Sequence, residues 1–223
     1  ASMDEFGNRE FGPSTEIQID DGQLPVFEHP DPKVDLAAIP ALPLINFLNE
    51  RGKKPYSLFL SKEVFPSPHV ALSLHAATSV LMVGFPNGIM DEVNNLPVVR
   101  RGTLATHYKA DYRGETNFAV DIAAFGGSSG SPVFAFFEGF MPGEHGSIAM
   151  TGVAHLFLIG VLHSGPIMNA EGKIVPIPTP TNTIIARTSL MIHLGYCVKS
   201  GRIDEMLPVI QDYSIPDRGQ LPS

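Results

Sequence analysis

The sequence has few of the residues that would support a disulfide framework, a multi-cysteine metal site or a nucleic-acid-binding surface. Its 223 residues include one cysteine, Cys197, which excludes an internal disulfide and any metal site built from several thiolates. Only 17% of the residues are charged, and 15 Lys and Arg against 23 Asp and Glu leave a formal net charge of −8. Because phosphate binding depends on clustered Lys and Arg, the composition argues against a nucleic-acid partner.

The sequence also lacks a hydrophobic run long enough to span a bilayer. The longest apolar stretch, residues 148–162, is interrupted by Thr151, Gly152, His155 and Gly160, which predicts paired strands and no membrane partner. The opening residues ASMDEFGNRE form no signal peptide and contain no initiator Met, so we expect a processed or shortened N-terminus. The shortage of cysteine fits an intracellular compartment without requiring one, and the oligomeric state stays open.

Apolar residues and turn residues are what the sequence does contain in quantity. Hydrophobic residues make up 43% of the chain, and there are 21 glycines and 20 prolines. From residue 78 onward, short apolar runs alternate with Gly/Pro turns, a pattern typical of an all-β barrel or sandwich. The expected strands cover residues 79–86, 98–107, 118–125, 131–140, 152–165 and 182–188.

The first third of the chain is less regular. Residues 1–14 are polar and predict a flexible lead-in. The alternation around Asp21 and Gly22 predicts a β-hairpin, and a second strand-like run covers residues 34–45. The charged and proline-rich segment 46–77 is interpreted as a linker between two halves.

The last residues, 200–223, are expected to form a short helix and a tail. Ser200 could cap this helix, which would run through Leu207 and end at Pro208. No other part of the sequence favours a helix over a strand, so the predicted class is all-β.

The local motif that most resembles a catalytic turn is FGGSSGSPVF, residues 125–134. Glycines allow backbone geometries in which N–H groups converge on one point, and such a point can stabilise the oxyanion of an acyl-transfer reaction. The plain alternative is a Gly/Ser turn between two strands, and composition alone leaves both open.

Several segments resemble chymotrypsin-like serine peptidases, in particular the trypsin-like peptidase domains of bacterial and HtrA type. GSSGSP resembles the G-x-S-G-[GS]-P signature, and EHPDPKVDLAAIP resembles the segment that carries the catalytic aspartate. GFPNGIMDEVNNLPVVRRGTLAT and LIGVLHSG resemble a hairpin and a pocket-lining strand of the same family. The resemblance implies a double β-barrel: residues 15–45 would be the remnant of an N-terminal barrel, and residues 78–199 the C-terminal barrel.

The resemblance also implies roles for individual residues. Ser129 would be the nucleophile, Asp35 would orient the base, and the N–H groups of Gly127 and Ser129 would form the oxyanion hole. The implied activity is hydrolysis of a polypeptide substrate through an acyl-enzyme, with no metal and no cofactor.

A catalytic histidine is not evident where the resemblance would place it. Only His29 precedes Asp35, and it does not stand in a T-x-x-H-V segment, so we expect it to be structural. The N-terminal barrel is therefore expected to be incomplete, without the catalytic histidine, and activity impaired or absent. The alternative function is a non-catalytic pseudopeptidase that binds extended peptides.

Substrate contacts are expected from two places. Ala123 takes the pocket-floor position at which relatives that cleave after Lys or Arg have a carboxylate, so a basic preference is not expected. His163, Ser164 and Gly165 end the pocket-lining strand, although Leu162 occupies the place of the histidine that selects Glu or Gln in relatives. A small apolar pocket is therefore expected.

A rival interpretation of the same turn is the G-x-S-x-G nucleophile elbow of α/β-hydrolases, with Ser128 as nucleophile. That fold needs a helix after the turn, and an acid such as Glu144 or Glu171 followed by a histidine such as His193. The apolar run after Pro132 favours a strand instead. Cys197 is expected to be a small buried hydrophobic residue.

Overall fold

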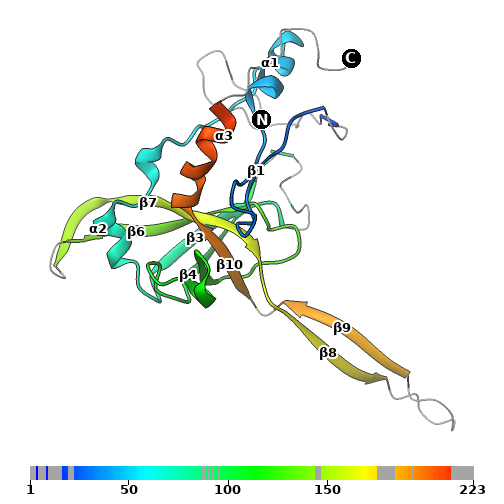
Figure 1. The fold of residues 1–223 in the computed structure, drawn as a ribbon, viewed down its shortest axis with the longest axis vertical. Helices are drawn as coiled ribbons and strands as arrows, with labels where there is room; N and C mark the ends of the chain where they lie inside the picture. Colours follow the sequence, from blue (N-terminus) through cyan, green and yellow to red (C-terminus); the bar gives the residue numbers. More distant parts are fainter. Residues whose placement is uncertain are drawn as a thin grey trace.

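The computed structural model describes residues 4, 9, 17–19, 23–86, 89, 91, 93, 94, 96–143, 147–174, 184–191 and 193–211. Six antiparallel strands form a closed barrel in the order β10–β5–β4–β3–β6–β7 (Figure 1). Their bounds are β3 Ser79–Gly84, β4 Val98–Leu104, β5 Asn117–Asp121, β6 Pro132–Pro142, β7 Ile148–Ser164 and β10 Leu194–Lys199. The all-β prediction is confirmed, and five of the six expected strands lie in this barrel.

The core of the barrel follows from the period of two along each strand, which turns alternate side chains to the inside. In β3, Val80 and Met82 are buried, and they pair with Ala135 and Val133 of β6. Phe118, with no exposed surface, packs edge-on against Tyr108 at a centroid distance of 5.2 Å. Cys197 is fully buried, as expected of a small hydrophobic residue, and burial raises the pKa of its thiol.

Two further strand pairs lie outside the barrel. β1 (Phe27–Glu28) pairs with β2 (Ala37–Ala38) in the N-terminal region. β8 (Ile167–Ile174) and β9 (Ile184–Met191) form a long hairpin that projects away from the barrel (Figure 1). The strand expected at 182–188 therefore exists but belongs to this projecting hairpin. The hairpin expected around Asp21 and Gly22 falls outside the described residues.

The strand interpretation of residues 34–45 is correct only for Ala37–Ala38. Helix α1 (Leu42–Glu50) begins in the second half of this range, with Pro43 in its first turn. Proline favours this position because the first N–H groups of a helix have no intrahelical partner and because its fixed φ suits a helix. The apolar run therefore belongs partly to a helix, although the prolines within the run had argued against one.

Residues 46–77 do more than connect two halves. They contain the end of α1, the 3₁₀ helix η1 (Lys62–Val64) and helix α2 (Pro68–Ser73). Val70, Ala71 and Leu74 are buried and belong to the core cluster of the barrel. Part of the predicted linker is therefore packed structure that contributes to the core of the barrel.

The C-terminal helix is present, but it is organised differently from the prediction. Residues Ser200–Met206 form the 3₁₀ helix η5, and α3 (Leu207–Gln211) follows with Pro208 inside its first turn. Ser200 is buried and lies 3.3 Å from the Tyr108 hydroxyl instead of capping the helix. A further 3₁₀ turn, η3, spans Tyr112–Gly114, and none of the described helices is long and apolar enough to cross a membrane.

Candidate functional site

The turn that carries Ser129 joins β5 to β6 at one end of the barrel. It bends through Gly127 and Gly130, whose φ angles of 77° and 85° lie in the left-handed region that favours glycine. The Gly130 N–H donates to the Leu162 carbonyl at 2.7 Å, and the Leu162 N–H donates to the Ser131 carbonyl at 2.9 Å. These two hydrogen bonds tie the turn to β7 and hold Ser129 beside the end of that strand.

The two central serines of the turn have opposite environments. Ser128 is 1% exposed, and its Oγ accepts a hydrogen bond from the Phe125 N–H at 3.3 Å. Ser129 is exposed, and its Oγ donates to the backbone carbonyl of His163 at 2.8 Å. The rival α/β-hydrolase interpretation is therefore wrong, because Ser128 is buried and strand β6, not a helix, follows the turn.

The backbone N–H groups of the turn are also of two kinds, those that donate a hydrogen bond within the protein and those that do not. Those of Ser128, Gly130 and Ser131 donate to carbonyl groups of the barrel or of the turn itself. Within the described part of the chain, the N–H groups of Gly127 and Ser129 donate no hydrogen bond, and both residues are exposed. The turn therefore leaves two backbone donors available to a ligand beside the Ser129 hydroxyl.

Asp35 and His163 meet next to this turn. Asp35 precedes β2, and its Oδ2 lies 3.7 Å from Nδ1 of His163 at the end of β7. The same Nδ1 lies 3.0 Å from the Ser164 hydroxyl. The carboxyl of Asp35 is 80% exposed, whereas the imidazole of His163 is only 17% exposed. The structure thus brings together three expected site residues, Asp35, Ser129 and His163, around one strand end.

The imidazole of His163 lies in surroundings that disfavour its charged form. Burial lowers its pKa below the usual value, and this effect outweighs the opposite influence of the Asp35 and Glu115 carboxylates. Its Nε2 is fully buried and has no hydrogen-bond partner among the described residues. Sequence reasoning placed His163 among the substrate contacts and missed its approach to Asp35, because only the tertiary structure brings the segment before β2 to the end of β7.

The remaining expected substrate residues lie on either side of this cluster. Ala123, in the segment that leads from β5 into the turn, is half-buried, and its carbonyl accepts a 2.7 Å hydrogen bond from Arg100 Nη1. Ser164 is exposed at the end of β7, and Gly165 follows it directly.

His29 serves as an anchor for the segment that carries Asp35. Its ring is fully buried; Nε2 lies 3.2 Å from the Arg202 carbonyl oxygen, and the Asp31 N–H donates to Nδ1 at 3.0 Å. Arg202 in turn forms a 2.8 Å ion pair with Asp31. Both ring nitrogens of His29 are therefore used structurally, as the sequence predicted, although the ring is buried rather than near the surface.

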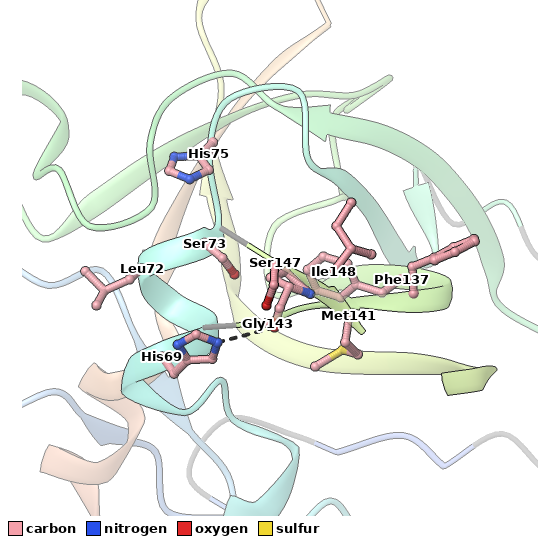
Figure 2. A pocket seen from close by; sticks show the side chains of 11 residues that line it. His69, Leu72, Ser73, His75, Phe137, Met141, Gly143, Ser147 and Ile148 are labelled. Atoms are coloured by element: carbon pink, nitrogen blue, oxygen red, sulfur yellow. Dashed lines mark hydrogen bonds between the residues drawn. The ribbon is translucent and has the colours of Figure 1, made fainter. Parts of the chain in front are cut away.

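A separate cavity of about 610 Å³ lies between α2 and the tip of the β6–β7 hairpin (Figure 2). His69 points into it from α2 and lies 3.3 Å from the Pro142 carbonyl oxygen, and the facing wall is formed by Phe137 and Met141. None of the expected site residues lines this cavity. Among the residues that the structure describes, no cluster of His, Cys, Asp and Glu is placed to hold a metal ion.

Comparison of the chain with protein-family models, with curated proteins and with solved structures finds no match. The geometry of the turn and of its neighbours is therefore the basis for assigning a function.

Proposed function

We propose that this protein is a serine peptidase of the chymotrypsin-like type, in which the described barrel is the C-terminal one of two. Ser129 is the nucleophile, and Asp35 orients the histidine that accepts its proton. The observation that carries this proposal is the meeting of Asp35 and Ser129, which are distant in sequence, at the same residue, His163. A plain turn between two strands would not require an aspartate from the N-terminal region beside it.

In the proposed reaction, the Ser129 oxygen attacks the carbonyl carbon of a peptide bond and its proton passes to the base. The free N–H groups of Gly127 and Ser129 would stabilise the negative oxygen of the tetrahedral intermediate, a contribution typically worth about 3 kcal/mol per donor. The base then protonates the leaving amine, and water hydrolyses the acyl-enzyme.

His163 is the described imidazole best suited to act as the base. Its Nδ1 faces Asp35, and its Nε2 has no hydrogen-bond partner among the described residues. Burial lowers its pKa, which favours the neutral form that can accept a proton. This assignment is an alternative to the expectation that the base is missing. It needs a rearrangement in which the buried Nε2 becomes accessible and the Ser129 hydroxyl moves to it from the His163 carbonyl.

A second candidate function is non-catalytic binding of extended peptides. The hydrogen bond from Ser129 Oγ to a backbone carbonyl favours it, because a hydroxyl held by an amide oxygen is not activated as a nucleophile. Both candidates use the same turn and differ only in whether Ser129 reacts.

The test is covalent labelling with a fluorophosphonate, read by intact mass. We expect a single adduct on the wild-type chain and on Ser61→Ala, a control at an exposed serine, and no adduct on Ser129→Ala. A His163→Gln variant that labels at least about 10³-fold more slowly would support His163 as the base.

Two outcomes would contradict parts of this proposal. Labelling that survives in His163→Gln would show that a different base activates Ser129. A folded wild-type chain, with a cooperative thermal transition, that is never labelled would overturn the peptidase function and favour peptide binding.

A further inference from the structure

Arg100 of β4 points into the end of the barrel that carries the Ser129 turn. It pairs with Met82 of β3, and Met82 also pairs with Val133 of β6. Residues opposite one another on neighbouring antiparallel strands point to the same face, and Met82 and Val133 are both buried. The Arg100 side chain therefore belongs to an inward-facing row with Met82 and Val133. Val133 follows Ser129 by four residues, just after the turn enters β6.

The guanidinium group of Arg100 lies against the segment that leads to Ser129. Its Nη1 donates to the Ala123 carbonyl at 2.7 Å, and its central carbon lies 4.6 Å from the centroid of the Phe125 ring. The carbonyl dipole and the negative face of the ring both favour a cation at this place. Contacts with two residues of the same segment place the positive charge next to the turn.

Among the described residues, this cation has no anionic partner. Arg100 is half-buried, yet it forms no ion pair with any described carboxylate, and its Nε is fully buried without a hydrogen bond. Arg202 also has a buried Nε without a hydrogen bond, but its charge is paired, because at 19% exposure it forms ion pairs with both Asp31 and Glu205. A partly buried charge without a counterion is unfavourable, so an unpaired arginine at this depth needs a further explanation.

We infer that Arg100 binds the carboxylate of an Asp or Glu side chain in a peptide held at Ser129, so that the site selects acidic residues. A guanidinium group presents several N–H donors in a plane and matches a carboxylate better than any other side chain does. The inference rests on the proposed function and revises the expectation of a small apolar pocket, which considered Ala123 without its arginine neighbour.

The experiment measures equilibrium binding of two fluorescent hexapeptides, acetylated and amidated at their ends, that differ only in a central Glu or Gln. On the wild-type chain we expect the Glu peptide to bind at least about tenfold more tightly, as for a hydrogen-bonded charge pair. In Arg100→Met this ratio should fall to about one. In Arg101→Met, which removes the exposed neighbour that pairs with Glu138, the ratio should persist.

Equal binding of both peptides by the wild-type chain would overturn the inference, whatever the variants do. A ratio that survives in folded Arg100→Met would overturn it as well. If Arg100→Met does not fold, Arg100→Lys keeps a cation, and a preference for Glu reduced but still above one is then expected. A third peptide with a central Gln and a free C-terminal carboxylate should gain nothing, and a gain would assign Arg100 to chain termini instead.

Fluorophosphonate labelling of the same samples separates this inference from the proposed function. A labelled Ser129 without preference for Glu means that the peptidase function stands and the role of Arg100 does not. A preference for Glu without labelling means that the acidic-peptide site stands and the peptidase function does not.

Discussion

The two halves of the candidate site are held in very different ways. Ser129 lies on a turn tied to β7 by hydrogen bonds of 2.7 and 2.9 Å, at the end of a closed barrel. Asp35 lies in a segment whose regular structure is a two-stranded pair of two residues each, and its side chain is 80% exposed. A cluster formed by His29, Asp31 and Arg202, here called the clasp, attaches that segment to the 3₁₀ helix η5.

This contrast means that the proposed nucleophile is held rigidly, whereas the proposed acid can change its position. Backbone hydrogen bonds of a closed sheet open only when the sheet unfolds, whereas a short segment held by a few side chains can open locally. Changes in the barrel should therefore alter global stability, and changes in the clasp should alter only the position of Asp35.

The largest expected effect comes from the acid itself. Asp35→Asn should slow fluorophosphonate labelling of Ser129 by about 10⁴-fold, because an amide cannot hold the base in the required tautomer. The melting temperature should not change, since the carboxyl is mostly exposed. Glu28→Gln, at another exposed acid of the same segment, is the control. Labelling of Asp35→Asn at the wild-type rate would remove Asp35 from the mechanism.

The second largest effect is expected for a substitution in the closed barrel, which holds the Ser129 turn. A Cβ at Gly160 of β7 would collide with the Val198 carbonyl of β10 and would lie 2.7 Å from the Phe118 ring. Gly160→Ala should therefore lower the free energy of unfolding by about 1–3 kcal/mol, measured by denaturant titration. Gly201→Ala, where a Cβ meets nothing within 4 Å, is the matched control. Equal stability of the two variants would mean that the barrel accommodates a side chain at this strand crossing.

A smaller and local effect is expected in the clasp. Arg202→Met removes the ion pairs with Asp31 and Glu205, so the segment around β1 and β2 should open more often. Hydrogen exchange of the His29 amide, which is bonded to the Leu36 carbonyl at 2.9 Å, should accelerate by up to about tenfold. Exchange in the barrel strands should stay the same, and an equal acceleration there would show that the two regions unfold together.

The smallest effect concerns pH. Burial lowers the pKa of His163 below its ordinary 6.5, so its imidazole stays neutral at pH values where an exposed histidine is already protonated. The decrease of the labelling rate on the acidic side of the pH profile should therefore have its midpoint below pH 6.5. Protonation of His163 should also weaken the folded state as the pH decreases through that range. Labelling rates and melting temperatures between about pH 4.5 and 8 measure both effects. A limb at or above pH 6.5 would exclude this imidazole as the base.

Much of the barrel was determined by the local sequence. Short apolar runs such as the one in Ser79–Gly84 predict strands, and the Gly/Pro turns separate one strand from the next. The period of two along a strand then turns Val80 and Met82 to the inside. The Ser129 turn was equally visible, because Gly127 and Gly130 supply the left-handed φ angles that the turn needs. These features depend on neighbouring residues alone, so a single sequence can carry them.

Other features were decided only in three dimensions. The burial of Leu74 depends on packing against the barrel, which a proline-rich composition does not reveal. The choice between Ser128 and Ser129 as the exposed hydroxyl follows from how the turn meets β7 in the closed barrel. The approach of Asp35 to His163 follows from how the N-terminal segment, which lies outside the barrel, meets the end of β7. Local patterns determine which residues form strands and turns, but long-range pairing determines which side chains face one another, because such contacts join residues that no local pattern connects.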